Sequence, residues 1–190
     1  FIFHFQLSIM TTVSSDKIIW TIGHSTRDLD TLVAMLRSFE IALVADIRSF
    51  PGSRRYPHFN KEALALSLPE NKIQYIHIRE LGGRRKVQAG SRNTAWRNAA
   101  FRGYADYMET ADFKKGIHLL EEVALTKRTA MMCSEAVWWR CHRSMVADYL
   151  KVHGWMVMHI MDTGKETEHP FTSAASIVDG GLSYRGTDSR

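Results

Sequence analysis

Residues 18–23 have the sequence IIWTIG, a short apolar and β-branched run that ends at a glycine. Such a run is typical of a strand that is buried on both faces. The segment after it carries apolar side chains at helical spacing, at Leu29, Leu32, Leu36 and Phe39. Ser25 or Thr26 is expected to cap the first turn of this helix, with Asp28 assisting near its positive end. The chain therefore begins its fold with a strand that leads directly into a helix.

The same order repeats along the chain. Further strands are expected at 42–47, 73–78, 129–132 and 155–160, and further helices at 60–68, 101–108, 112–124 and 145–150. Pro69 is expected to stop the first of these helices, Asp112 to cap the third and Gly154 to end the last. Strands that alternate with helices form parallel sheets covered on both faces, so the sequence predicts a three-layer α/β/α domain. Its sheet should be mostly parallel with about five strands, followed by a small C-terminal hairpin over 177–184.

The connection at 81–98 stands apart from this pattern. It is rich in glycine and basic residues and has no hydrophobic period, which predicts a long loop. A loop of that length in a compact domain is usually a lid or a binding loop.

Length and composition agree with one ordinary domain. The chain has 190 residues, of which 45% are hydrophobic. Residues 1–17 contain a Ser/Thr-rich run and are expected to be a flexible leader, which leaves 18–190 as a single α/β domain. No stretch approaches the roughly 20 apolar residues of a membrane span. The two cysteines, Cys133 and Cys141, lie in one short segment, as in proteins of a reducing compartment, so a cytoplasmic location and no membrane partner are expected.

Positive charge is concentrated in the expected loop. The whole chain has 25 basic and 20 acidic residues, a net charge of +5, yet the segment from Arg79 to Arg102 alone holds seven basic residues against Glu80. Such a segment attracts phosphate-bearing partners, either a small molecule such as a nucleotide or a nucleic acid. The alternative is a solvated basic surface. The oligomeric state is left open by the sequence.

Polar residues gather where the predicted strands end, and ligands of parallel sheets bind beyond the carboxyl ends of the strands. The candidate catalytic residues are His24, Asp46, Cys133, Glu135 and His142. His24 would act as acid or base, Asp46 and Glu135 would orient groups or transfer protons, and Cys133 would be a nucleophile or a ligand. The candidate substrate-binding residues are Ser25, Arg48, Arg84, Arg85, Arg140 and Arg143. A plain ion pair is the alternative for Asp46 and Arg48.

The segment at 133–143, CSEAVWWRCHR, supports two kinds of chemistry. A cysteine after a strand, followed by an arginine near a helix start, is the arrangement of thiolate-based phosphatases and sulfurtransferases. Arg140 comes one residue later than their C-x5-R spacing, and the loop has no glycine to form a phosphate cradle. Cys133, Cys141 and His142 are also candidate ligands of a metal, with zinc or iron as the ions that suit them, although folding requires no cofactor. A third interpretation is that both thiols are buried structural groups.

Five separated motifs occur in an order that resembles the DUF488 family, a group of small bacterial and archaeal proteins of unknown function. They are TIGHS at 21–25, DIR at 46–48 with Pro51 and Ser53, LGG at 81–83, MCSE at 132–135 with CHR at 141–143, and HPFT at 169–172. The resemblance covers about 18–184. It implies an α/β fold with a shared polar site, carried here by His24, Ser25, Asp46, Arg48, Cys133, Glu135, Cys141, His142 and Arg143. It implies no particular reaction.

The leading hypothesis is an enzyme, a hydrolase or transferase, that acts on a phosphate-bearing substrate. One alternative is a nucleic-acid-binding module without catalysis, in which the basic loops hold the ligand. Another is a thiol-based sensor or sulfur carrier that uses Cys133 and Cys141. The sequence thus predicts the place of a site and leaves its reaction open.

Overall fold

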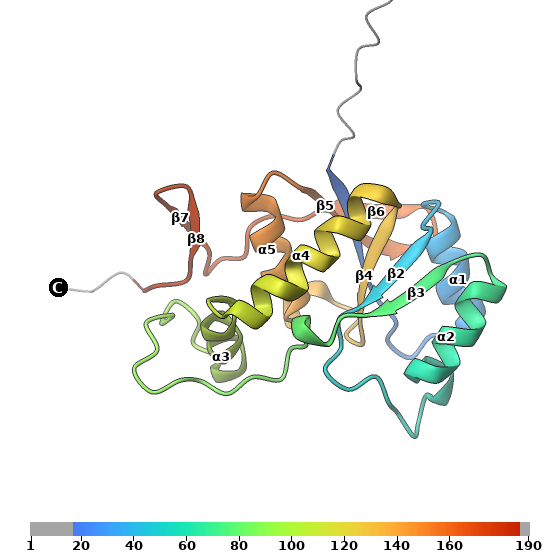
Figure 1. Ribbon diagram of the computed structural model, residues 1–190, viewed down its shortest axis with the longest axis horizontal. Helices are drawn as coiled ribbons and strands as arrows, with labels where there is room; N and C mark the ends of the chain where they lie inside the picture. The colour runs from blue at the N-terminus through green and yellow to red at the C-terminus, as the bar shows by residue number, and fades with distance from the viewer. Residues whose placement is uncertain (1–16, 187–190) are drawn as a thin grey trace, which may run out of the picture.

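The computed structural model describes residues 17–186 of the chain (Figure 1). Apart from Lys17, the expected leader at 1–17 lies outside the described residues, so that expectation stays a prediction. Within 17–186, no helix has the combination of length and apolar character that a membrane crossing needs.

A six-stranded sheet forms the centre of the fold. Its strands are β1 (Ile18–Gly23), β2 (Leu43–Asp46), β3 (Gln74–His77), β4 (Thr129–Cys133), β5 (Met156–Asp162) and β6 (Lys165–Glu168). They lie in the order β3-β2-β4-β1-β5-β6, with β1 to β5 parallel and β6 antiparallel to β5. The mostly parallel sheet is thus confirmed. The sequence prediction lacked β6, because the residues of this edge strand, KETE, are all exposed and leave no apolar pattern.

Helices cover both faces of the sheet, which confirms the three-layer α/β/α architecture. The helices are α1 (Leu29–Arg37), α2 (Lys61–Glu70), α3 (Ala99–Met108), α4 (Ala111–Thr126) and α5 (Arg143–Val152). Figure 1 shows α1 and α2 on the side of the sheet opposite α4 and α5. Successive side chains of a strand point to opposite faces. Val44 therefore joins the apolar cluster under α1 and α2, while Leu43 and Ala45 join the cluster under α3, α4 and α5.

Three residues expected to cap or stop a helix do not do so in the structure. Asp28 itself is the N-cap of α1, accepting from the backbone N–H of Thr31 at 2.7 Å, because Ser25 adopts a left-handed turn with φ 53° before the helix. Thr110 caps α4 in place of Asp112, which lies in the first turn. Pro69 lies inside the last turn of α2, where its missing N–H costs only a terminal hydrogen bond. The helix therefore continues to Glu70.

Two expectations near the C-terminus are confirmed. Gly154 follows α5 with φ +82°, the left-handed conformation that ends a helix. The hairpin forms from β7 (Ser176–Val178) and β8 (Gly181–Ser183). Its two turn residues, Asp179 and Gly180, both have positive φ, as a tight hairpin turn requires.

The long basic connection is also confirmed, since no helix or strand occurs between Gly82 and Asn98. Asp106 of α3 holds this loop by accepting hydrogen bonds from Gln88, Ser91 and Asn93 at 2.5–2.9 Å. Those bonds also lower the pKa of the Asp106 carboxyl, although the burial of this group opposes them. The loop is therefore fixed to the body of the protein at its centre.

The topology leaves a crevice at the carboxyl end of β4. The neighbouring strands β1 and β2 lead into α1 and α2 on one face, whereas β4 leads into α5 on the other face. Ligands of open α/β sheets bind where such connections diverge. Cys133, the last residue of β4, lies at the centre of this crevice.

Candidate functional site

A cavity of about 720 Å³ opens at the carboxyl ends of β1, β2 and β4. Most of the residues expected at the site line it: His24, Ser25, Arg48, Arg84, Cys133, Glu135, Arg140, Cys141 and His142. Asp46, Arg85 and Arg143 are not among its lining residues. The structure thus collects side chains from four separate segments around one space.

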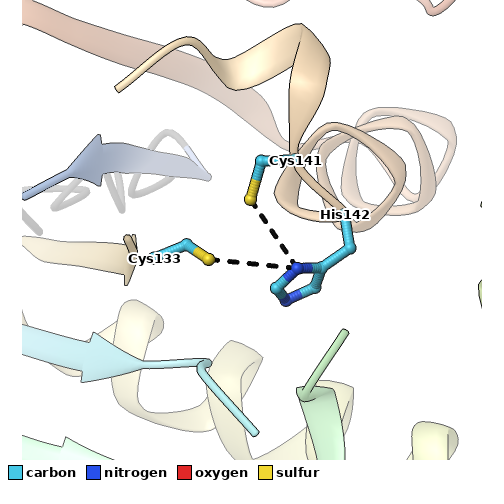
Figure 2. A group of neighbouring side chains, drawn as sticks. All are labelled: Cys133, Cys141 and His142. Atoms are coloured by element: carbon cyan, nitrogen blue, oxygen red, sulfur yellow. Dashed lines mark hydrogen bonds between the residues drawn. The ribbon is translucent and has the colours of Figure 1, made fainter. Parts of the chain in front are cut away.

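Two thiols and an imidazole lie together at the floor of this cavity, and we call Cys133, Cys141 and His142 the cysteine–histidine cluster (Figure 2). The Nδ1 atom of His142 lies 3.9 Å from the Sγ of Cys133 and 3.6 Å from the Sγ of Cys141. Cys133 ends β4, whereas His142 caps the start of α5. Both cysteines are free and buried. The crevice between β4 and α5 therefore brings three nucleophilic or ligating atoms within reach of one another.

The hydrogen bonds of His142 determine its tautomer. Its Nε2 lies 3.1 Å from the backbone carbonyl oxygen of Ile47. A carbonyl oxygen only accepts, so Nε2 carries the proton and Nδ1 presents its lone pair to the two sulfurs. Gly83 makes room for this ring, because a Cβ at that position would overlap the Nδ1 and Cγ atoms of His142.

The two thiols have opposite pKa shifts. The pKa of Cys133 is lowered well below its usual value, first because the Cys141 thiol donates a hydrogen bond to the thiolate and further by the charge of Arg143, while burial opposes the shift. Burial and the neighbouring Cys133 raise the pKa of Cys141. Cys133 is therefore the sulfur that carries negative charge more readily.

Arg143 holds the loop that follows β4 in place near the cluster. Its side chain is 2% exposed and donates to the backbone carbonyl oxygens of Glu135 and Ala136. Within residues 17–186, its Nε is a buried donor without a hydrogen-bond partner, and no carboxylate pairs with its charge. The bonded loop passes so close to β1 that a Cβ at Gly23 would overlap the Glu135 carbonyl group. Arg143 therefore shapes the loop after β4 and places a positive charge near the sulfurs.

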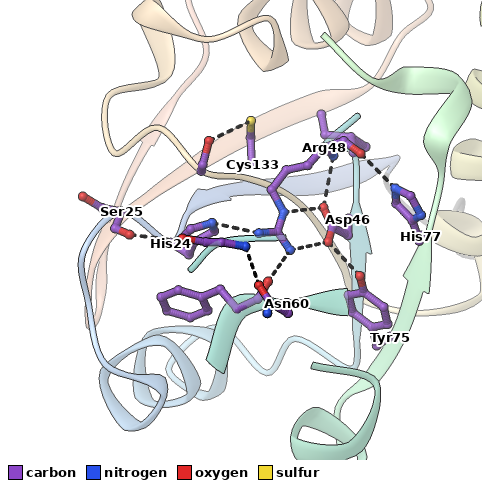
Figure 3. Close-up of polar contacts among 12 residues, drawn as sticks. His24, Ser25, Asp46, Arg48, Asn60, Tyr75, His77 and Cys133 are labelled. Atoms are coloured by element: carbon purple, nitrogen blue, oxygen red, sulfur yellow. Dashed lines mark hydrogen bonds and ion pairs between the residues drawn. The ribbon is translucent and has the colours of Figure 1, made fainter. Parts of the chain in front are cut away.

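Asp46 and Arg48 form a buried, two-pronged ion pair (Figure 3). The Nε and Nη2 of Arg48 donate to the two carboxylate oxygens of Asp46 at 2.9 and 2.6 Å, and Nη2 also donates to the carbonyl oxygen of Phe59. Tyr75 donates its hydroxyl to Asp46 at 2.7 Å, and burial followed by this carboxylate raises the pKa of the phenol. The guanidinium of Arg48 is thus largely committed to its neighbours.

His24 completes this network. Its Nε2 lies 3.0 Å from Nη1 of Arg48 and its Nδ1 lies 2.9 Å from the carbonyl oxygen of Ser25. Since arginine only donates and a carbonyl only accepts, the proton is on Nδ1 and the Nε2 lone pair is already used. Burial, followed by the charge of Arg48, lowers the pKa of His24 to about 4. The ring is therefore neutral at pH 7, with both nitrogens engaged.

The rim of the cavity carries the available positive charge. Arg84 and Arg140 are exposed, and within 17–186 neither forms an ion pair with a carboxylate. The Arg84 guanidinium lies 5.8 Å from the ring of Phe50, an aromatic side chain that is 65% exposed. Arg85 differs from its neighbour, because it lies over the Tyr107 ring at 3.5 Å and donates to the carbonyl oxygen of Gly82. It fastens the loop to α3 outside the cavity.

A second buried network, centred on His159, was not predicted from the sequence. The hydroxyl of Thr21 contacts Nδ1 of His159 at 2.7 Å, and Nε2 of His159 contacts Nδ1 of His169 at 2.9 Å. His169 in turn contacts Asp148 at 2.9 Å, and Trp138 stacks on His159 at 4.4 Å. Burial, followed by His169, lowers the pKa of His159 to about 2. These residues are far apart in the sequence, and the motifs that contain Thr21, Trp138 and His169 gave no sign that these side chains meet.

Comparison with known proteins identifies one related family. A family model described as a domain of unknown function, DUF488, matches residues 28–150. Neither the curated proteins nor the solved structures contained a match to this chain.

Proposed function

The chain belongs to the DUF488 family of domains of unknown function, and from the cavity described above we propose that it is an enzyme acting on a phosphate-bearing substrate, a nucleotide or a nucleic acid. The reaction would take place at the cysteine–histidine cluster, with the phosphate held at the rim.

The observation that carries this proposal is the Nδ1 lone pair of His142, which lies between two buried sulfurs at the floor of an open cavity. A neutral imidazole nitrogen next to a thiol is the arrangement that activates a nucleophile or binds a catalytic metal. A purely structural histidine rarely directs its lone pair at two buried sulfurs, which are weak hydrogen-bonding groups, since buried polar groups normally find strong partners.

The rim supports a phosphate-bearing substrate. Arg84 and Arg140 line the cavity and are exposed, so their charges are free to meet an anion that enters. The guanidinium of Arg48 is largely engaged with its neighbours, so it is a poorer substrate-binding group than the sequence analysis expected. We assign Arg48 and Asp46 a different part, which is to keep the ends of β1 and β2 in place next to the cluster.

Aromatic side chains around the same opening favour a nucleotide over a simple phosphate ester. Phe50 is exposed beside Arg84, and Tyr56 and Phe101 also line the cavity. Bases stack on such rings and on arginine planes without requiring a particular sequence. Glu135, the one carboxylate among the described residues that line the cavity, would transfer the proton in the reaction.

The first test compares the binding of AMP and of adenosine by isothermal titration calorimetry. If the rim holds the phosphate, AMP binds and adenosine binds at least tenfold more weakly. Arg140→Gln and Arg84→Gln should each weaken AMP binding about tenfold, which corresponds to the loss of one charge-assisted hydrogen bond. Arg92→Gln is the matched control, because Arg92 is exposed on the same basic loop and does not line the cavity.

The second test looks for turnover. Wild-type protein is incubated with a set of nucleoside mono-, di- and triphosphates and with 5′-phosphorylated single strands of DNA and RNA, and products are identified by mass spectrometry. One class should change mass, and His142→Gln should slow that reaction at least about 100-fold while His118→Gln on exposed α4 leaves it unchanged. Binding without any change of mass would replace the enzyme proposal with a non-catalytic binding module.

A further inference from the structure

We propose that the cysteine–histidine cluster is a zinc site, with Zn²⁺ held by Sγ of Cys133, Sγ of Cys141 and Nδ1 of His142 and a fourth position open to the cavity. This inference rests on the proposed function, because it names the cofactor of the same cavity.

The three ligand atoms already have the spacing of a metal site. They all lie within 4.8 Å of one another, and Nδ1 lies 3.6 and 3.9 Å from the two sulfurs. A tetrahedral zinc ion with Zn–S bonds of about 2.3 Å and a Zn–N bond of about 2.0 Å separates neighbouring ligand atoms by roughly 3.5–3.8 Å. The cluster therefore needs only a small contraction to hold the ion.

The donor set suits zinc. Two thiolates and one imidazole prefer soft or borderline cations such as Zn²⁺ to Mg²⁺ or Ca²⁺, which take oxygen ligands. Figure 2 shows the His142 ring at the start of α5 with both thiols facing it.

The surroundings of His142 are those of a ligating histidine. Its Nε2–H donates to the carbonyl oxygen of Ile47, which holds the ring and directs the Nδ1 lone pair toward the sulfurs. Metal-bound histidines usually donate their second ring N–H to a carbonyl or a carboxylate in this way. The backbone N–H of Arg143 lies 3.5 Å from Sγ of Cys141, as an outer hydrogen bond to a bound thiolate.

The burial of the two cysteines and the charge that their thiolates would carry also favour a bound cation. Cys133 and Cys141 are 6% and 3% exposed, so a pair of thiolates there requires compensation by positive charge. Arg143 alone supplies only one positive charge, whereas Zn²⁺ supplies two and binds both thiolates directly.

The cavity determines what kind of zinc site this would be. Structural zinc ions have four protein ligands, whereas catalytic ones have three and keep one position for water or substrate. All three members of the cluster line the cavity, and Glu135 lies on the same loop, two residues after Cys133. The fourth position would therefore be reached from the side on which Arg84 and Arg140 lie.

The test measures metal content in the full chain, purified without nickel or chelator and then dialysed against buffer containing Zn²⁺. Elemental mass spectrometry should find about one zinc per chain. Cys141→Ser and His142→Gln should each lower this to below about 0.1, and His118→Gln should leave it at about one. Circular dichroism shows which variants are folded.

A second measurement on the wild-type chain covers the case in which the variants fail to fold. The metal is removed with chelator and replaced by Co²⁺, and an absorption band from thiolate-to-cobalt charge transfer is expected. Zn²⁺ should also slow the reaction of both thiols with a disulfide reagent at least tenfold. Absence of the cobalt band, together with equal thiol reactivity with and without Zn²⁺, would overturn the zinc site.

Failure of this inference can be told apart from failure of the proposed function. If neither zinc nor cobalt binds at the cluster while AMP binding and turnover persist, the zinc site is wrong and the enzyme proposal stands. If zinc binds at one equivalent but no nucleotide binds or reacts, the zinc site stands and the proposed substrate class is wrong.

Discussion

The Nε2 of His142 lies 3.1 Å from the carbonyl oxygen of Ile47, and this contact joins the start of α5 to the residue that follows β2. The same bond fixes the imidazole so that its other nitrogen faces Cys133 and Cys141. The backbone carbonyl of the residue that follows β2 therefore decides which atom of a distant histidine is available for chemistry.

The tautomer of His142 can be observed directly. We expect ¹⁵N NMR of selectively labelled, zinc-free protein to show a protonated Nε2 and an unprotonated Nδ1 for this ring at pH 8. The reason is that the Ile47 carbonyl oxygen accepts a hydrogen bond and cannot donate one. His142→Gln assigns the signals, and a proton on Nδ1 would contradict the arrangement of the cluster.

Gly83 should be intolerant of a side chain. A Cβ at this position would overlap the imidazole of His142, so Gly83→Ala has to displace the ring from its place between the sulfurs. We expect destabilisation by about 1–3 kcal/mol in urea unfolding and a change in the His142 NMR signals. Gly52→Ala is the control, because nothing lies within 4 Å of a Cβ there. Equal effects of the two substitutions would show that Gly83 has no special part.

The ion pair of Asp46 and Arg48 should be essential for stability. Asp46 is fully buried and its carboxylate accepts from Arg48 and Tyr75. Asp46→Asn leaves the guanidinium buried without its counter-charge, which should cost about 3–5 kcal/mol of unfolding free energy. Asp179→Asn, at an exposed turn residue, is the control, and it should change the unfolding free energy by less than about 0.5 kcal/mol. A loss below 1 kcal/mol for Asp46→Asn would mean that water reaches this pair.

His24 should make stability depend on pH between 6.5 and 4. The folded protein keeps this ring neutral with a pKa of about 4, whereas the unfolded chain takes up the proton near 6.5. The free energy of unfolding is therefore unaffected by His24 above pH 6.5 and falls as the pH drops toward 4, by about 3 kcal/mol. His159, with a pKa of about 2, acts in the same direction.

The measurement for His24 is the slope of the unfolding free energy against pH, in wild type and in His24→Gln. The variant should have a shallower slope between pH 4 and 6.5, whatever its stability at pH 7. His118→Gln, at an exposed position of α4, should keep the wild-type slope. An unchanged slope in His24→Gln would mean that this ring is protonated in the folded protein.

Much of the fold was predictable because it depends on local patterns. The buried strand at 18–23 and the amphipathic helix after it show their identity within a few residues, since the strand is a short, continuous apolar run and the helix has apolar residues at a period of 3.6. The same holds for the hairpin at 177–184, with its Asp179-Gly180 turn. The exposed strand β6 has no such pattern. At the starts of α1 and α4 several nearby side chains could act as the cap, and backbone geometry determines that Asp28 and Thr110 do so.

Local sequence patterns were therefore enough to predict the α/β class, the order of its elements and the ends of the strands at which polar residues gather. Which of those residues meet, and which groups stay available, depends on the folded arrangement. It placed Cys133, Cys141 and His142 within 4.8 Å of one another, turned Arg85 away from Arg84, and used up the hydrogen-bonding groups of His24 and Arg48. These outcomes depend on the crossing of connections over the sheet and on single backbone carbonyls, and such contacts between distant segments leave no periodic trace in the chain.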